Sequence, residues 1–211
     1  MEPTEKELEI AERIVNDLID HDFFKAVICR DGETFCNWCD DNKDYLEDNG
    51  LALHCGETKA CVLSSKLLNW VIKVGFVETD ESEDYCAIEA GNYKSAVEEG
   101  LEKFFAAVYK LGSWVLPEDY GLKRNITFFI QEKAEPDEDL TSETCEEYMD
   151  CDEDCLEDLE RVESVFGGLK NCKELNRLFE FIKKWNINDL HTGNFGYTGY
   201  GDIKIIDFSG Y

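Results

Sequence analysis

The sequence predicts an α+β fold built as two lobes. Three observations lead to this prediction. Short β-prone runs separated by turn residues occupy residues 51–76, a helical pattern follows at about 84–111, and a strongly acidic segment with helical spacing covers 132–163. This order, closing on a short β segment, is expected when helices and an antiparallel sheet occupy separate parts of one body. The chain has 211 residues, of which 43% are apolar, which is enough for a core of this size.

The first expected element is an amphipathic helix over about residues 4–20. Thr4 and Glu7 form a capping-box pattern at its start. Apolar residues then recur at helical spacing: Leu8, Ala11, Ile14, Val15, Leu18 and Ile19. Residues 23–50 are expected to form short strands and turns. Residues 1–50 are therefore interpreted as an N-terminal helix and extension that precedes the body of the protein.

The body is expected to begin with an antiparallel meander. Its three strands are predicted from β-prone runs: Leu51–Cys55, Ala60–Ser64 and Trp70–Phe76. A helix is expected over about residues 84–111. Its apolar side contains a recurring set of residues: Ile88, Tyr93, Ala96, Val97, Leu101, Phe104 and Phe105. Two more strands are expected, near 107–115 and at 126–131.

The next segment is dominated by negative charge. Residues 132–163 hold sixteen acidic side chains and two basic ones. The apolar residues within it keep helical spacing: Cys145, Met149, Leu156, Leu159 and Val162. The segment is therefore predicted to be a solvated acidic helix rather than a disordered linker. Another helix is expected over 173–185, and loops with a short strand over 186–211.

The net charge excludes several classes of partner. The sequence contains 48 acidic and 21 basic side chains, a formal net charge of −27. Such a surface repels phosphate backbones and anionic lipid, so binding to nucleic acid or to a membrane through a basic patch is not expected. An acidic DNA mimic stays open as an alternative. Because the N-terminus is acidic and no apolar run reaches the roughly 18 residues of a membrane helix, we expect a cytoplasmic protein.

The 10 cysteines are interpreted mainly as reduced, buried small hydrophobes, as expected in the cytoplasm. Cys36 and Cys39 have zinc-knuckle spacing, and Cys29, Cys55 and Cys61 lie near them in sequence. No second CxxC pair follows. A structural zinc near Cys36 and Cys39 is the alternative.

The strongest chemical signal lies near the end of the sequence. Asp189 and Asn194 stand five residues apart in the motif DLHTGN, and Asp207 follows Asn194 by thirteen residues. Phosphoryl transfer from ATP requires such a set. One aspartate orients or deprotonates the attacking hydroxyl, while an asparagine and a second aspartate hold magnesium across the phosphates.

These motifs resemble the protein-kinase-like superfamily, in which HRDxxxxN is followed by DFG. The wording DLHxGN is closest to the small-molecule branch, such as aminoglycoside and choline kinases, and to phage-borne kinase-like proteins. The resemblance implies that Asp189 is the catalytic aspartate and that Asn194 and Asp207 bind Mg²⁺. It extends over about residues 51–211, three-quarters of the chain.

The same resemblance assigns roles to residues upstream. The sequence WVIK ending at Lys73 matches the V-A-I-K pattern. Lys73 is therefore the candidate for the α/β-phosphate lysine, and Glu89 on the following helix is expected to pair with it. Gly56 is the glycine present where kinases carry a glycine-rich loop. Glu132 and Ala134 end a strand as the hinge strand does, and their backbone would bind adenine.

The resemblance implies a protein-kinase-like two-lobe fold. An antiparallel N-lobe sheet would occupy residues 51–134, and a reduced helical C-lobe residues 135–211, because the sequence stops four residues after Asp207. The implied function is an ATP- and Mg²⁺-dependent phosphotransferase acting on an unidentified small-molecule or protein acceptor. The alternative is a kinase-like regulator that binds nucleotide or a protein without turnover. A homodimer could cover apolar surface exposed by a reduced lobe.

Overall fold

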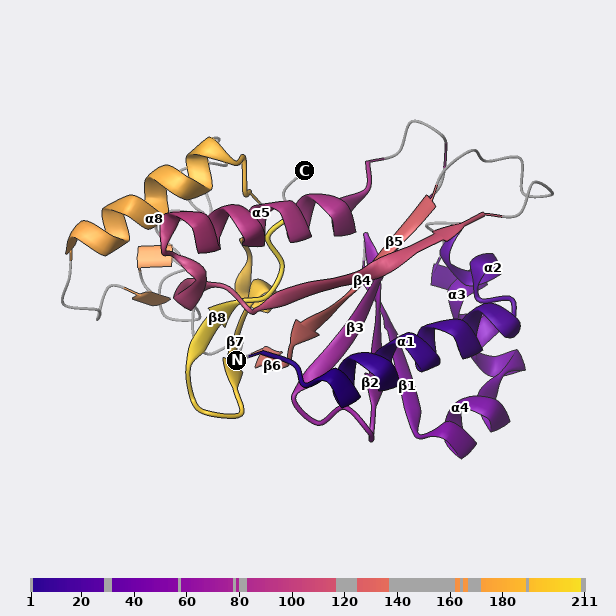
Figure 1. The fold of residues 1–211 in the computed structure, drawn as a ribbon. Coiled ribbons are helices and arrows are strands. Elements are labelled where there is room, and N and C mark those ends of the chain that lie inside the picture. The colour runs from indigo at the N-terminus through magenta and orange to yellow at the C-terminus, as the bar shows by residue number, and fades with distance from the viewer. Residues whose placement is uncertain are drawn as a thin grey trace. The chain divides into compact units, whose positions relative to one another are not determined.

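The computed structural model of the protein contains helices and two antiparallel sheets, which confirms the predicted α+β class (Figure 1). The residues that it describes are 2–28, 32–56, 58–77, 79, 83–116, 125–136, 162–163, 165–166, 172–188 and 190–209. The chain divides into two compact units. The first consists of Met1–Ala90 and Ala107–Glu132, and the second of Gly91–Ala106 and Lys133–Tyr211.

A five-stranded antiparallel sheet forms the centre of the first unit, with the strand order β1-β2-β3-β5-β4. Its strands are β1 (Leu51–Cys55), β2 (Lys59–Ser64), β3 (Trp70–Gly75), β4 (Val108–Val115) and β5 (Asn125–Glu132). Each begins and ends within one residue of the run that predicted it. Strand β3 lies between β2 and β5, and all six of its residues are buried.

The first helix, α1 (Glu5–Asp20), begins with the predicted capping box. The Thr4 hydroxyl accepts a hydrogen bond from the Glu7 backbone N–H at 3.3 Å, and the Glu7 carboxylate accepts one from the Thr4 backbone N–H at 2.8 Å. The helix lies across the sheet strands of the first unit (Figure 1). It buries the apolar residues of its periodic face: Ala11, Ile14, Val15 and Leu18.

The prediction of short strands for residues 23–50 is wrong, because the described residues of this segment are mainly helical. It forms α2 (Phe24–Val27), α3 (Gly32–Asp41) and α4 (Lys43–Asn49). Aromatic packing accounts for the difference. Phe23 contacts Trp38 with ring centroids 4.8 Å apart, and Phe35 contacts Phe76 at 6.1 Å. Helical spacing places Phe35 and Trp38 on one side of α3, so tertiary contacts stabilise helices too short to be recognised from their periodicity.

Two glycines in the left-handed region end helices. Gly50 has φ 63° and caps α4 immediately before β1. Gly100 has φ 66° and follows α5 (Tyr85–Glu99), where the Leu101 N–H donates to the Ala96 carbonyl at 2.8 Å. The helix predicted over 84–111 is therefore too long. Its apolar pattern continues past Gly100 because these later residues are buried in another conformation: Leu101, Phe104 and Phe105.

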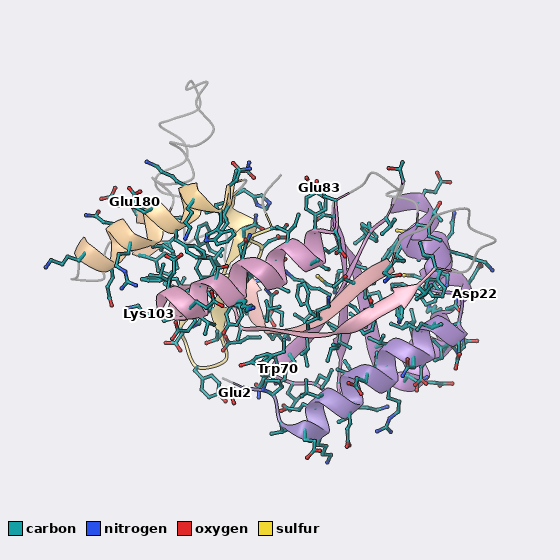
Figure 2. The ribbon with its side chains drawn as sticks, turned by 45° about the horizontal axis from the view of Figure 1, so that its top comes forward. Glu2, Asp22, Trp70, Glu83, Lys103 and Glu180 are labelled. Carbon is teal, nitrogen blue, oxygen red and sulfur yellow. The ribbon has the colours of Figure 1, made fainter. Side chains whose placement is uncertain are left out.

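The second unit contains the remainder of α5, η1 (Glu102–Phe104), α8 (Cys172–Lys184) and a small antiparallel sheet of order β6-β7-β8. The strands are β6 (Ala134–Pro136), β7 (Phe195–Thr198) and β8 (Ile203–Ile205). Phe105 packs against Phe181 and Phe208, with ring centroids 5.6 and 4.9 Å away. Lys103, labelled in Figure 2, pairs with Glu174 of α8 at 2.6 Å.

The helix predicted at 173–185 is confirmed as α8. Most of the predicted acidic helix, residues 137–161, lies outside the described residues. The start of the predicted segment forms β6, and Val162 near its end is helical and buried. None of the described helices is both long enough and apolar enough to cross a membrane.

Candidate functional site

The first unit contains a buried ion pair between Lys73 and Glu89. Lys73 Nζ on β3 lies 3.4 Å from Glu89 Oε1 on α5. The Lys73 side chain is 8% exposed and the Glu89 side chain is 0% exposed. The pair expected from the sequence is therefore present, and it lies in the interior, where a charge is costly unless it has a partner.

A second lysine, which the sequence pattern did not reveal, contacts the same glutamate. Lys59 Nζ lies 2.7 Å from Glu89 Oε2, and the Lys59 side chain is only 3% exposed. The register explains its position. Cys61 pairs with Lys73 across β2 and β3, and Lys59 precedes Cys61 by two residues, so both lysines extend from the same face of the sheet. A lysine at the start of an apolar strand does not by itself indicate a contact with Glu89. The contact becomes apparent only from the register of β2 and β3.

Gln131 of β5 also contacts Glu89. Its Nε2 donates a hydrogen bond to Glu89 Oε1 at 2.8 Å. Gln131 pairs with Val71, two residues before Lys73, and so it extends from the same face of the sheet as Lys73. Strands β2, β3 and β5 each contribute one polar side chain to Glu89.

The start of α5 is attached to the sheet next to this cluster. Asp84 Oδ1 accepts a hydrogen bond from the Ala87 N–H at 2.9 Å, and Asp84 Oδ2 accepts one from the Thr127 hydroxyl at 2.5 Å. Cys86 is fully buried, and this burial raises the pKa of its thiol well above the ordinary value. Cys86 is therefore a neutral packing residue beside charged neighbours, whereas Asp84 sets the position from which Glu89 reaches the sheet.

Gly56 and Glu132, both predicted as cofactor-binding residues, lie at ends of strands in the first unit. Gly56 is in the turn between β1 and β2, where its N–H donates to the Lys59 carbonyl at 2.9 Å. Glu132 ends β5 and makes two contacts with Ala107: its N–H donates to the Ala107 carbonyl at 2.8 Å, and its carboxylate accepts from the Ala107 N–H at 3.3 Å. In the second unit, Ala134 begins β6 opposite Thr198 of β7.

The hairpin of β7 and β8 brings Asn194 and Asp207 to the same end of the second unit. Asn194 immediately precedes β7, and the Ile206 N–H, just after β8, donates to the Asn194 carbonyl at 2.8 Å. Asn194 is 9% exposed and Asp207 is half-buried. Ser209 donates from its hydroxyl to Asp207 Oδ1 at 3.3 Å. Residues thirteen apart in the sequence thus become neighbours across a hairpin.

Two further contacts hold this end of the hairpin. The Asn194 N–H donates to the His191 carbonyl at 2.9 Å, which closes the short turn η4 (Thr192–Asn194). Asn92 on α5 donates from Nδ2 to the Phe208 carbonyl at 2.8 Å, and this buried bond holds the segment directly after Asp207. No local sequence pattern identifies Asn92, because its partner is more than 100 residues away. Asp189 lies outside the described residues.

Asn194 and Asp207 have the donor chemistry that Mg²⁺ prefers. An amide and a carboxylate oxygen are hard ligands, and Mg²⁺ commonly takes one or two protein ligands while substrate phosphates and water supply the others. The donor chemistry of these two residues therefore fits a magnesium ion.

Of the cysteines considered for the zinc alternative, Cys29 lies outside the described residues. Cys36 is exposed and Cys39 is half-buried on α3, and burial, with a smaller effect of Cys36, raises the pKa of Cys39 to about 11. Within the described residues, no cluster of three or more histidine, cysteine, aspartate or glutamate side chains could hold a metal ion.

No protein-family model matches the chain, and no curated protein matches it. Among solved structures, the chain is similar to the bifunctional kinase-methyltransferase WbdD, with a TM-score of 0.31 and 13% sequence identity. The matched region covers 72% of this chain and 30% of that protein, so the chain spans less than a third of its length.

Proposed function

We propose that the protein is an ATP- and Mg²⁺-dependent phosphotransferase with a kinase-like two-lobe arrangement, acting on a small-molecule or protein acceptor. The buried Lys73–Glu89 pair is the observation that carries the proposal. Replacing a buried ion pair by apolar residues of similar volume is often neutral or stabilising. Stability alone is therefore a weak reason for charges at this position, whereas a lysine oriented by a glutamate is what phosphate binding requires.

The proposed roles follow the chemistry of each side chain. Lys73 would bind the α- and β-phosphates, and Glu89 would orient Lys73. Asn194 and Asp207 would hold Mg²⁺, which when bound neutralises charge on the phosphates. Asp189 would position the acceptor hydroxyl for transfer.

The nucleotide base and phosphates would meet backbone groups as well. Gly56 lies in the β1–β2 turn, where the main chain can approach a phosphate closely. The backbone around Glu132 and Ala134 would bind adenine. The order of elements agrees with these roles, since β3 with its lysine is followed by α5 with its glutamate, then by β4 and β5, and finally by the hairpin with Asn194 and Asp207.

Nucleotide binding without turnover is the second candidate function. It is favoured by the β1–β2 turn, which spans only residues 56–58 and contains a single glycine, Gly56. Kinases cover the phosphates with a glycine-rich loop, and a reduced loop provides fewer backbone contacts for the transferred group. ATP binding without phosphate release or transfer would support this candidate over the first.

Calorimetric titration of ATP, with and without Mg²⁺, tests the proposed site. We expect micromolar binding that requires Mg²⁺ and is lost in Asp207→Ala. Asp202→Ala is the matched control, because Asp202 is exposed on the same hairpin and should leave ATP binding unchanged. Absence of ATP binding in the wild type, or equal binding in Asp207→Ala, would refute the proposal.

Turnover is tested separately from binding. ATP hydrolysis, or transfer to a panel of hydroxyl acceptors, should be lost in Asp189→Ala while ATP binding persists. An ATP-consuming activity that is unchanged in Asp189→Ala would show that Asp189 does not have the proposed role.

A further inference from the structure

The two carboxylate oxygens of Glu89 have different partners. Oε1 is contacted by Lys73 Nζ at 3.4 Å and by Gln131 Nε2 at 2.8 Å. Oε2 is contacted by Lys59 Nζ at 2.7 Å. The Lys59 ammonium is the contact that compensates this buried oxygen.

The two lysines are therefore not equivalent partners of Glu89. Lys59 is the closer of the two, and its side chain is 3% exposed compared with 8% for Lys73. If Lys73 moves away, Oε1 keeps its hydrogen bond from Gln131. If Lys59 is removed, Oε2 loses the contact that compensates it. Since electrostatic attraction weakens with distance and a buried charge needs a close partner, Glu89 depends more on Lys59 than on Lys73.

We propose that Lys59 is the standing counter-ion of Glu89 and, through Glu89, a positioning residue for Lys73. By binding Oε2, Lys59 fixes the carboxylate in the orientation that presents Oε1 to Lys73. It also keeps Oε2 of Glu89 paired while Lys73, still oriented by Oε1, contacts a bound phosphate. The role toward Lys73 rests on the proposed function, whereas the role toward Glu89 does not depend on any ligand.

The position of Lys59 in the fold suits this role. Lys59 begins β2 directly after the β1–β2 turn, and its carbonyl accepts the Gly56 N–H at 2.9 Å. The same residue thus closes the turn through its backbone and holds the α5 glutamate through its side chain. Lys59 thus connects the β1–β2 turn to α5, and this connection does not require a glycine-rich loop.

A double-mutant cycle in urea tests the role toward Glu89 without any nucleotide. The variants are Lys59→Met, Lys73→Met and Glu89→Gln, with the doubles K59M/E89Q and K73M/E89Q. We expect the coupling between positions 59 and 89, expressed as a change in the unfolding equilibrium constant, to exceed that between 73 and 89 by roughly tenfold. An equal or larger coupling between 73 and 89 would overturn the proposal.

The cycle stays informative if Lys59→Met does not fold. The double variant K59M/E89Q removes one charge of each sign and is expected to fold, because Glu89 is the reason that Lys59 is needed. Folding of the double without the single supports the proposal, and failure of both to fold contradicts it.

Affinities for ATP and adenosine test the role toward Lys73. In a folded Lys59→Met protein we expect ATP to bind roughly tenfold more weakly and adenosine to bind as in the wild type, because only the phosphate contact depends on Lys73. Lys66→Met, at an exposed lysine in the turn after β2, should change neither affinity. Equal effects on both ligands, or none on ATP, would refute the positioning role. A wild type that binds no ATP would refute the proposed function, while the urea cycle still decides the role toward Glu89.

Discussion

Lys73 Nζ lies 3.4 Å from Glu89 Oε1, which connects the central strand of the first unit to the start of α5. The two residues are sixteen positions apart in the sequence, and both side chains are buried. The contact therefore depends on how β3 and α5 pack rather than on local chain geometry. The contribution of this contact to the free energy of unfolding can be measured independently of any activity.

Glu89→Gln should lower the free energy of unfolding by about 2–4 kcal/mol, because it removes the carboxylate that two buried lysines share. Urea denaturation monitored by tryptophan fluorescence measures the change. Glu98→Gln on the same helix is the control. Glu98 pairs with Lys94 at 3.9 Å on the surface, so this substitution should change the free energy by less than about 0.5 kcal/mol. Similar changes in the free energy of unfolding at both positions would show that the buried cluster contributes no more to stability than the exposed Glu98–Lys94 pair.

Asn92→Ala should destabilise the protein by about 1–3 kcal/mol, because the buried Phe208 carbonyl loses the hydrogen bond that Asn92 donates at 2.8 Å. Thermal unfolding measures this effect. Ser95→Ala is the matched control on α5, since the Ser95 hydroxyl makes an exposed bond to the Gly91 carbonyl. If the melting temperature of Asn92→Ala equals that of Ser95→Ala, the Asn92 bond does not hold the segment after Asp207.

Two glycines, one within α5 and one directly after it, should respond to alanine in opposite directions. Gly91 lies within the helix with no atom near the position of an added Cβ, so Gly91→Ala should stabilise the protein by about 0.5–1 kcal/mol. Gly100 has φ 66°, where a Cβ is strained, so Gly100→Ala should destabilise it by about 1 kcal/mol. Chemical denaturation of both variants provides the comparison. The same sign for both would contradict the helix end at residue 99.

The capping box should contribute stability that disappears in acid. Hydrogen bonds from Thr4, the backbone N–H first and then the hydroxyl, hold the pKa of Glu7 below its ordinary value of 4.5. Glu7 is thus more acidic in the folded state than in the unfolded state. Its contribution is complete above the ordinary pKa and is lost as the pH falls through the lowered one.

Unfolding of the wild type and of Glu7→Gln as a function of pH measures this contribution. The wild type should be the more stable protein near neutral pH, and the difference should shrink as the pH is lowered below the ordinary value of 4.5. Glu9→Gln, an exposed residue of the same helix, controls for general charge effects. A difference that stays constant over the acid range would show that Glu7 does not act through its carboxylate.

The strands of the first unit were predictable because their signals are local. Alternating or continuous apolar runs bounded by turn residues indicate a strand whatever the strand pairs with. Thr4 and Glu7 likewise define the start of α1 through contacts three residues apart. These patterns do not state which strands are neighbours, and the order β1-β2-β3-β5-β4 emerges only from pairing.

The secondary-structure predictions fail where packing between residues distant in the sequence outweighs the local preference of the chain for a helix or a strand. The described residues of 23–50 become helical because Phe23, Phe35 and Trp38 pack together. They also pack against Trp114 of β4 and against Phe76, directly after β3. The apolar pattern beyond Gly100 suggested more helix, although Phe105 there packs against side chains from other elements of the second unit. In both cases the apolar residues are buried as their pattern indicates. Whether they lie in a helix, a strand or a loop depends on the side chains against which they pack.

Sequence alone determined the candidate residues Lys73, Glu89, Asn194 and Asp207, because each stands at a recognisable position relative to a strand or turn. It also determined the start of α1 and the five strands of the first unit, whose signals are local. Only the tertiary structure decided that Lys59 and Gln131 share Glu89 with Lys73. The physical reason is register, since a shift of one residue would turn either side chain to the opposite face of the sheet.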